Sequence, residues 1–118
     1  MIFNETDSLN YHGQEVKFYT PTKKTAGRVK KIFRKEPITI TWMDNMKQGD
    51  TVIDIGANVG MYSLMSAVSR KANVYAFEPE ASNYNLLCQN IRLNNVQDKV
   101  TAYCAGNLDF DGFSVLNI

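Results

Sequence analysis

The central part of the chain alternates short apolar runs with segments of helical periodicity. Three runs rich in β-branched or aromatic residues, 51–55, 73–77 and 99–104, each have the length of a strand. The first has the pattern of a strand that is buried on both faces of a parallel sheet. Between them, apolar residues recur every three or four positions over 61–68 and again over 84–91, which predicts a helix in each interval. This order is the βαβαβ half of a doubly wound α/β fold, and right-handed crossovers place its strands in the order 3-2-1.

Less regular patterns flank this central part. Towards the N-terminus, residues 16–19 predict a short strand and residues 26–34 an amphipathic helix. A second helix is expected to begin at Pro37 and to continue to a Gly-Asp turn. Towards the C-terminus, an Asp-Gly turn signal precedes residues 113–118, which are expected to form an antiparallel strand.

This pattern divides the chain into an N-terminal approach segment, residues 1–48, and a βαβαβ half-domain, residues 49–118. At 118 residues the two parts form one domain. A doubly wound sheet is built from two such halves, so the domain is expected to be truncated after its third parallel strand and one further strand. The first strand then has an open edge, which favours a fragment of a longer fold or a homo-oligomer paired through that edge.

Composition and charge narrow the possible partners. The net charge is +1, but eight Lys and Arg residues and no acidic residue lie between Lys17 and Lys35. We interpret this run as the solvated face of a helix, so neither a nucleic-acid nor a membrane partner is expected. No signal peptide or membrane-spanning run is apparent. The cysteines and the single histidine lack metal-ligand spacing, so we expect no metal and a reduced, cytoplasmic protein.

The turn after the first predicted strand reads Asp54-x-Gly56-x-x-x-Gly60. Ligands of open parallel sheets bind outside the carboxyl ends of the strands, where the strand order reverses, and the first strand lies at that point. Gly56 permits a sharp turn and a close approach of ligand to backbone, and Gly60 permits close packing of the following helix. Asp54 places a carboxylate where it can meet a cationic ligand group.

This turn differs from the dinucleotide fingerprint Gly-x-Gly-x-x-Gly, whose middle glycine admits a pyrophosphate. Asn58, or Ala57 in a shifted alignment, stands in its place. A ligand without pyrophosphate does not need that glycine, and S-adenosylmethionine is such a ligand, with an ammonium that suits Asp54. Glu78 directly follows the second strand, where an acidic residue about 20 positions past the glycine turn accepts hydrogen bonds from ribose hydroxyls.

These motifs resemble those of FkbM-type methyltransferases. Residues 52–63, VIDIGANVGMYS, are similar to the first motif of that family, and residues 76–95, which begin AFEPE, are similar to its second. Upstream, residues 35–44 are similar to the approach segment of many members. The resemblance implies a Rossmann-like class I methyltransferase fold, S-adenosylmethionine as the donor, and O-methylation of a small-molecule or sugar hydroxyl.

The resemblance also implies roles for single residues. Glu78 would hold the ribose and Pro79 would lie near the adenine. Residues after the third strand often touch the adenine in such folds. The catalytic base is unknown, because the segment that carries the family's acidic motif beside the acceptor is not part of this sequence. The residues expected on the methionine side are Asp54, Gly56, Ala57, Asn58 and Gly60, and those expected after the third strand are Ala105, Gly106 and Asn107.

Five conspicuous side chains are not assigned a role in catalysis or ligand binding. His12 is expected at the surface. The other four are expected to be packing groups: Trp42, Tyr62, Cys88 and Cys104.

Three other functions remain open at this point. A donor-binding module without turnover would bind the cofactor but form no product. A nicotinamide oxidoreductase on a similar half-fold is disfavoured by the missing middle glycine. A nucleic-acid-binding protein is supported only by the Lys17–Lys35 charge run, and binding that collapses with modest salt would be its mark.

Overall fold

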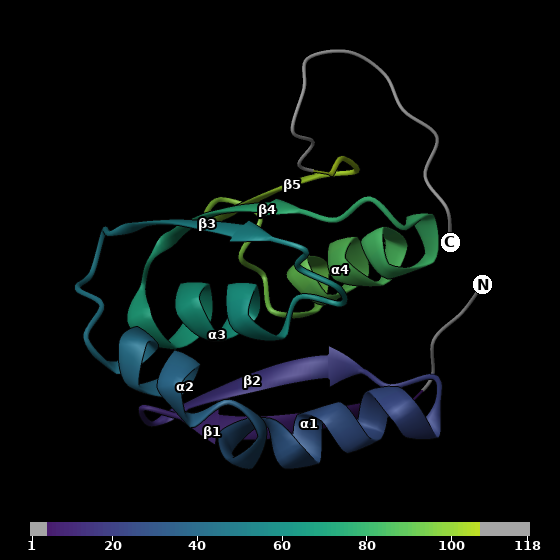
Figure 1. Ribbon diagram of the computed structural model, residues 1–118, viewed down its shortest axis with the longest axis horizontal. Coiled ribbons are helices and arrows are strands. Elements are labelled where there is room, and N and C mark those ends of the chain that lie inside the picture. The colour runs from purple at the N-terminus through teal and green to yellow at the C-terminus, as the bar shows by residue number, and fades with distance from the viewer. Residues whose placement is uncertain (1–4, 107–118) are drawn as a thin grey trace.

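The computed structural model describes residues 5–106, which form a β-hairpin, a three-stranded sheet and four helices (Figure 1). The strands are β1 (Thr6–Tyr11), β2 (Gln14–Tyr19), β3 (Thr51–Ile55), β4 (Asn73–Phe77) and β5 (Val100–Tyr103). The helices are α1 (Lys23–Lys35), α2 (Pro37–Asp44), α3 (Met61–Arg70) and α4 (Ala81–Leu93).

The central sheet is parallel, with β4 between β3 and β5. Asp54 is level with Ala76, and Ile55 is level with Phe77, so β3 and β4 end at the same edge of the sheet. Helices α3 and α4 form the two crossovers. The predicted α/β class, Rossmann-like arrangement and strand order are therefore confirmed.

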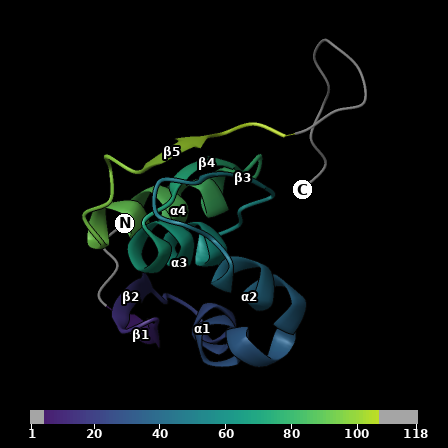
Figure 2. The ribbon, with the colours of Figure 1, turned by 90° about the vertical axis from the view of Figure 1, so that its left-hand side faces the viewer.

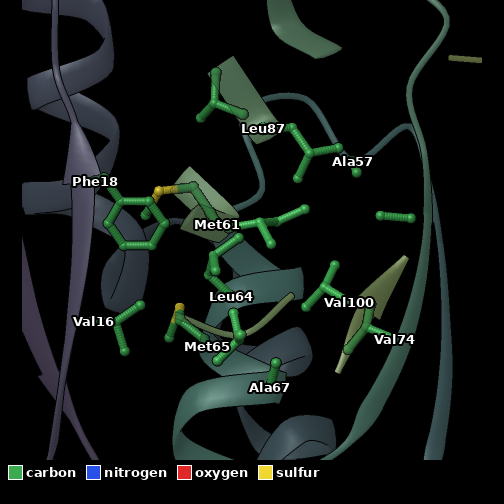
Figure 3. Close-up of a cluster of buried hydrophobic side chains, with 14 of the residues drawn as sticks. Val16, Phe18, Ala57, Met61, Leu64, Met65, Ala67, Val74, Leu87 and Val100 are labelled. Atoms are coloured by element: carbon green, nitrogen blue, oxygen red, sulfur yellow. The ribbon is translucent and has the colours of Figure 1, made fainter. Parts of the chain in front are cut away.

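The elements stack in three layers, the middle one made of helices (Figures 1 and 2). The parallel sheet covers one side of α3 and α4, and the β1–β2 hairpin with α1 alongside it covers the other. Figure 3 shows Val16 and Phe18 of β2 facing α3 from one side, and Val74 and Val100 of the sheet from the other. All four side chains are buried, so a single core extends through both interfaces.

Helix α3 is buried more completely than its sequence pattern predicts. The pattern indicates one apolar stripe, but Ser63, Ser66 and Ala67 outside that stripe are also fully buried. Their small side chains let the helix lie between two sheets at close range. Ser63 lies on the side of the parallel sheet, where its hydroxyl donates to Asp54 of β3. Figure 3 shows Met61 and Met65 of the predicted stripe on the side of the hairpin. The helix is buried on more than one side because it lies between the sheet and the hairpin.

The sequence pattern predicts β2 but misses β1. Only Leu9 and Tyr11 alternate inward along β1, among polar residues. The turn residues His12 and Gly13 have φ angles of 48° and 77°, as in the two-residue hairpin turns that match strand twist. The His12 ring lies at the surface, as expected, with Nε2 2.8 Å from Oδ1 of Asp44.

One face of the parallel sheet carries no helix within residues 5–106 (Figure 2). Ile53 and Ile55 are 64% and 57% exposed on this face, and Tyr75 and Tyr103 are exposed as well. The expectation that the first strand is buried on both faces is therefore wrong for the described residues. β3 is an edge strand of this sheet, as expected. Pairing of that edge with another chain stays a prediction.

The structure also tests the side chains that were expected to be packing groups. Trp42 is 56% exposed on α2 and Cys104 is exposed, so a packing role is wrong for both, whereas Cys88 is half-buried. Asn107 and the predicted strand over residues 113–118 lie outside the described residues. Within residues 5–106, no helix has the length and apolar character needed to cross a membrane.

Candidate cofactor-binding site

The connection between β3 and α3 is a tight loop held against the end of β4. The backbone N–H groups of Gly56 and Ala57 both donate to the carbonyl of Phe77, at 2.8 and 3.0 Å. Gly56, Asn58 and Gly60 have φ angles of 75°, 55° and 96°. Glycine and asparagine adopt this left-handed region at the lowest cost, which explains why these residues form the loop.

The two glycines of the loop have different surroundings. A Cβ on Gly60 would lie 2.6 Å from Cδ1 of Leu87 and 2.7 Å from Cδ2 of Leu64, both fully buried. Gly60 therefore lets the loop pack closely against α4. A Cβ on Gly56 would meet no atom within 4 Å. The space beside Gly56 is open, as a ligand that approaches the backbone requires.

Glu78, the residue after β4, is buried and fixes the shape of the loop. Its side chain is 3% exposed. Oε1 accepts a hydrogen bond from the backbone N–H of Asn58 at 2.7 Å, and Oε2 accepts one from that of Glu80 at 2.9 Å. Each carboxylate oxygen can accept a second hydrogen bond, so the group can hold the loop and still bind a hydroxyl.

Asp54, near the end of β3, is half-buried at the start of the same loop. Its Oδ2 accepts a hydrogen bond from the Ser63 hydroxyl of α3 at 2.6 Å. Burial raises the pKa of this carboxyl above its usual range, the Ser63 hydrogen bond acts in the opposite direction, and the Glu78 carboxylate raises it further. A bound cation would favour the ionised form, so the site is suited to a positively charged group.

A cavity of about 300 Å³ opens beside this loop. One wall is the tip of β3, the loop itself and the first turn of α3. The opposite wall is the C-terminal half of α1. The lining residues are Arg28, Ile32, Lys35, Glu36, Asp54, Ile55, Gly56, Ala57, Asn58, Val59, Met61 and Tyr62.

The structure brings most of the predicted residues together. Four line the cavity: Asp54, Gly56, Ala57 and Asn58. Of these, Ala57 has its side chain in the core, so it offers the cavity only its backbone. Gly60 and Glu78 shape the loop from behind. Pro79 lies at the next strand end, where a Cβ on Gly106 would be 3.4 Å from its Cβ.

The sequence analysis missed the contribution of α1 and the residue after it. Arg28, Ile32 and Lys35 line the cavity, and their spacing of i, i+4 and i+7 is a signal for one helix face. Tyr62, interpreted as a packing group, lines the cavity too and donates its hydroxyl hydrogen bond to Glu36. No group of three or more potential metal ligands occurs within residues 5–106.

A sequence profile of the TRM5/TYW2 methyltransferase domain matches residues 29–117, about three quarters of the chain. The chain belongs to this family. Membership confirms the predicted class I methyltransferase fold with S-adenosylmethionine as its cofactor. It replaces the FkbM assignment with a different family of S-adenosylmethionine-dependent enzymes.

Individual relatives agree with this assignment. The chain is 39% identical over 69 residues to a tRNA(Phe) (4-demethylwyosine(37)-C(7)) aminocarboxypropyltransferase from Pyrococcus horikoshii, covering 58% of this chain and 25% of that protein. It is 35% identical over 63 residues to the methyltransferase sdnD from Sordaria araneosa, covering 52% and 24%. The crystal structure of P. horikoshii TYW2 in complex with MeSAdo has a TM-score of 0.61 at 28% identity, covering 91% of this chain and 38% of that one. The chain thus spans about a quarter of the length of these curated relatives.

These findings correct the predicted partners. The expectation of a small-molecule acceptor and of no nucleic-acid partner is wrong, because a TRM5/TYW2 relative is named for its action on tRNA(Phe). From the sequence, the Lys17–Lys35 run is interpreted as a solvated face, with nucleic-acid binding left as an alternative. The same clustering of cations also binds phosphate backbones, and sequence alone does not separate the two cases.

Proposed function

We propose that this chain is the cofactor-binding part of an S-adenosylmethionine-dependent methyltransferase that modifies RNA, with tRNA as the first candidate acceptor. The observation that carries the proposal is the loop anchored by Glu78 in a chain of the TRM5/TYW2 family. In this proposal Asp54 meets the ammonium of the cofactor, Glu78 accepts hydrogen bonds from the ribose, and Pro79 lies beside the adenine.

The charge on α1 supports an RNA acceptor. This helix contains seven Lys and Arg residues and no acidic residue. Arg28 and Lys35 line the cavity, while Lys30, Lys31 and Arg34 are exposed on the same helix. Cations on an exposed helix bind RNA phosphates by releasing counterions. An RNA held on this helix would therefore lie directly beside the cofactor.

The sulfonium of S-adenosylmethionine carries both a methyl group and an aminocarboxypropyl group. The family is described as a methyltransferase domain, whereas the P. horikoshii relative is named an aminocarboxypropyltransferase. We propose methyl transfer. Aminocarboxypropyl transfer would need the same cofactor in the same site, so the experiment below distinguishes the two reactions.

The protein is incubated with transcribed tRNA and with cofactor labelled either in the methyl carbon or in the carboxyl carbon. We expect the methyl label in the RNA and the carboxyl label in solution. Carboxyl label in the RNA would instead establish aminocarboxypropyl transfer. Cofactor binding without either label in RNA would contradict methyl transfer to tRNA by this chain and favour a donor-binding module. The Glu78→Gln variant, weakened in cofactor binding, serves as the control for label transfer.

The affinity for S-adenosylmethionine is expected to fall as the pH is lowered. The fall should begin at a higher pH than it would if Asp54 had the pKa of an ordinary aspartate. The cation binds the ionised form of Asp54, and the pKa of this carboxyl is raised by burial, so protonation occurs early as the pH falls. Loss of a hydrogen bond to a charged group raises the dissociation constant about 10- to 100-fold. Calorimetric titration between about pH 8 and pH 4.5 measures it.

Two variants test the assignment of this pH dependence. Ser63→Ala removes the hydroxyl that favours the ionised form of Asp54, so the loss of affinity should move to higher pH. Asp54→Asn should bind weakly and without this pH step. An unchanged profile in Ser63→Ala would contradict the role of Asp54.

A further inference from the structure

The cavity beside the glycine loop carries charges of both signs, and it extends towards α1. Asp54 lies on the loop side. Arg28 and Lys35 lie on the α1 side, next to Glu36, which accepts a hydrogen bond from Tyr62. Glu78 is not part of the lining, although Asn58, whose N–H it accepts, is. The cavity thus lies next to the proposed ribose contact.

Arg28 is the half-buried cation of this cavity, and the other cation, Lys35, is exposed. The Arg28 side chain lies on the cavity side of α1. Within residues 5–106, neither an ion pair nor a hydrogen bond engages its guanidinium. Asp54 and Glu36 each have a hydroxyl donor, from Ser63 and Tyr62. A half-buried cation with no partner is costly, and an anionic ligand group would offset that cost.

The amino-acid end of S-adenosylmethionine is a zwitterion, with a carboxylate and an ammonium on one carbon. We infer that Arg28 binds this carboxylate, while Asp54 faces the ammonium, so that the cavity selects the amino-acid end by its two charges. The inference rests on the proposed function, since it names a second contact for the same cofactor. Arg28 lies outside the residues that the family profile matches.

Arg28 fits this role better than the neighbouring Lys35. Lys35 is exposed and also borders a shallow outer hollow with Lys31 and Arg34, so it lies at the rim of the cavity. The guanidinium is planar and presents paired N–H donors that match the two oxygens of a carboxylate. Ile32, one turn further along the same helix face, is buried and fixes the rotation of α1 that points Arg28 inward.

The first test needs no substitution. S-adenosylmethionine and its decarboxylated form differ only in the carboxylate, so their dissociation constants for the parent chain isolate that group. We expect S-adenosylmethionine to bind about 10- to 100-fold more tightly, as for a hydrogen-bonded charge pair. Equal affinities would overturn the inference and leave the proposed function intact. Failure of the parent to bind either compound would overturn the proposed function as well.

The second test locates the carboxylate contact. Arg28→Met keeps most of the aliphatic stem and removes the charge. It should lower the affinity for S-adenosylmethionine to that of the decarboxylated form, and change the latter by less than about twofold. Lys30→Met, exposed on the same helix and absent from the lining, is the matched control and should change neither. An Arg28→Met chain that binds S-adenosylmethionine like the parent, or that loses both ligands equally, would overturn the assignment.

Discussion

Replacing Glu78 by Gln is expected to weaken S-adenosylmethionine binding by about 10- to 100-fold. The carboxylate accepts backbone N–H groups from Asn58 on one oxygen and from Glu80 on the other. A Gln amide has one oxygen and one NH₂ group, so one of these N–H groups would face another donor. The loop must then shift, and the ribose loses a charged acceptor. Calorimetric titration of the variant measures the change.

The matched control is Glu80→Gln. Glu80 is also an acid near the end of β4, but its carboxylate accepts the N–H groups of Ser82 and Asn83 and so caps α4. We expect the affinity of the Glu80→Gln variant for the cofactor to stay within about twofold of that of the parent. Equal effects of the two substitutions would contradict a specific role for Glu78.

The parallel sheet and the glycine loop were predictable because their signals are local. A β-branched run fixes β3, and the loop needs left-handed backbone at Gly56, Asn58 and Gly60, which restricts the residue types. The acid after β4 follows from the length of one helix and one strand. Since parallel strands end at one edge, Asp54 and Glu78 had to lie near each other.

The opposite wall of the cavity was not predictable in this way. Arg28 precedes the glycine loop by almost thirty residues, and α1 packs against β1 rather than against β3. Its approach to the loop depends on the whole N-terminal layer, which includes a strand that the pattern misses. The sequence pattern therefore places the basic residues of α1 in solvent, although two of them, Arg28 and Lys35, line the cavity.

The attachment of the β1–β2 hairpin to α4 was not predictable from the sequence pattern either, because it depends on the side chains of two asparagines of α4. Oδ1 of Asn90 accepts the N–H of Tyr19 at 2.8 Å, and Oδ1 of Asn94 accepts the N–H of Lys17 at 2.9 Å. Nδ2 of Asn94 donates to the carbonyl of Lys17 at 2.8 Å. One helical turn, about 5.4 Å, nearly matches two residues of a strand, about 6.6 Å, so the amides can bind alternate positions of β2. These side chains occupy the outer edge of β2 in place of another strand.

Asn90→Leu is expected to lower the free energy of unfolding by about 2–5 kcal/mol. The Asn90 side chain is fully buried, and its Nδ2 also donates to the carbonyl of Val59 in the glycine loop at 2.8 Å. Leucine has nearly the same shape but neither donor nor acceptor. The Val59 carbonyl and the Tyr19 N–H would each lose this partner in the interior, at about 1–3 kcal/mol per group. Urea denaturation of parent and variant measures the difference.

Asn94→Ala separates this buried contact from its partly exposed neighbour. Asn94 bonds the same strand from the same helix face, but it is half-buried, so water can replace part of what is lost. Asn94→Ala is expected to lower the free energy of unfolding by about 0.5–1.5 kcal/mol. Asn90→Leu should also weaken cofactor binding, because Val59 lies in the cavity wall, whereas Asn94→Ala should not. Equal destabilisation by both substitutions would show that burial of Asn90 is not what secures the hairpin to the loop.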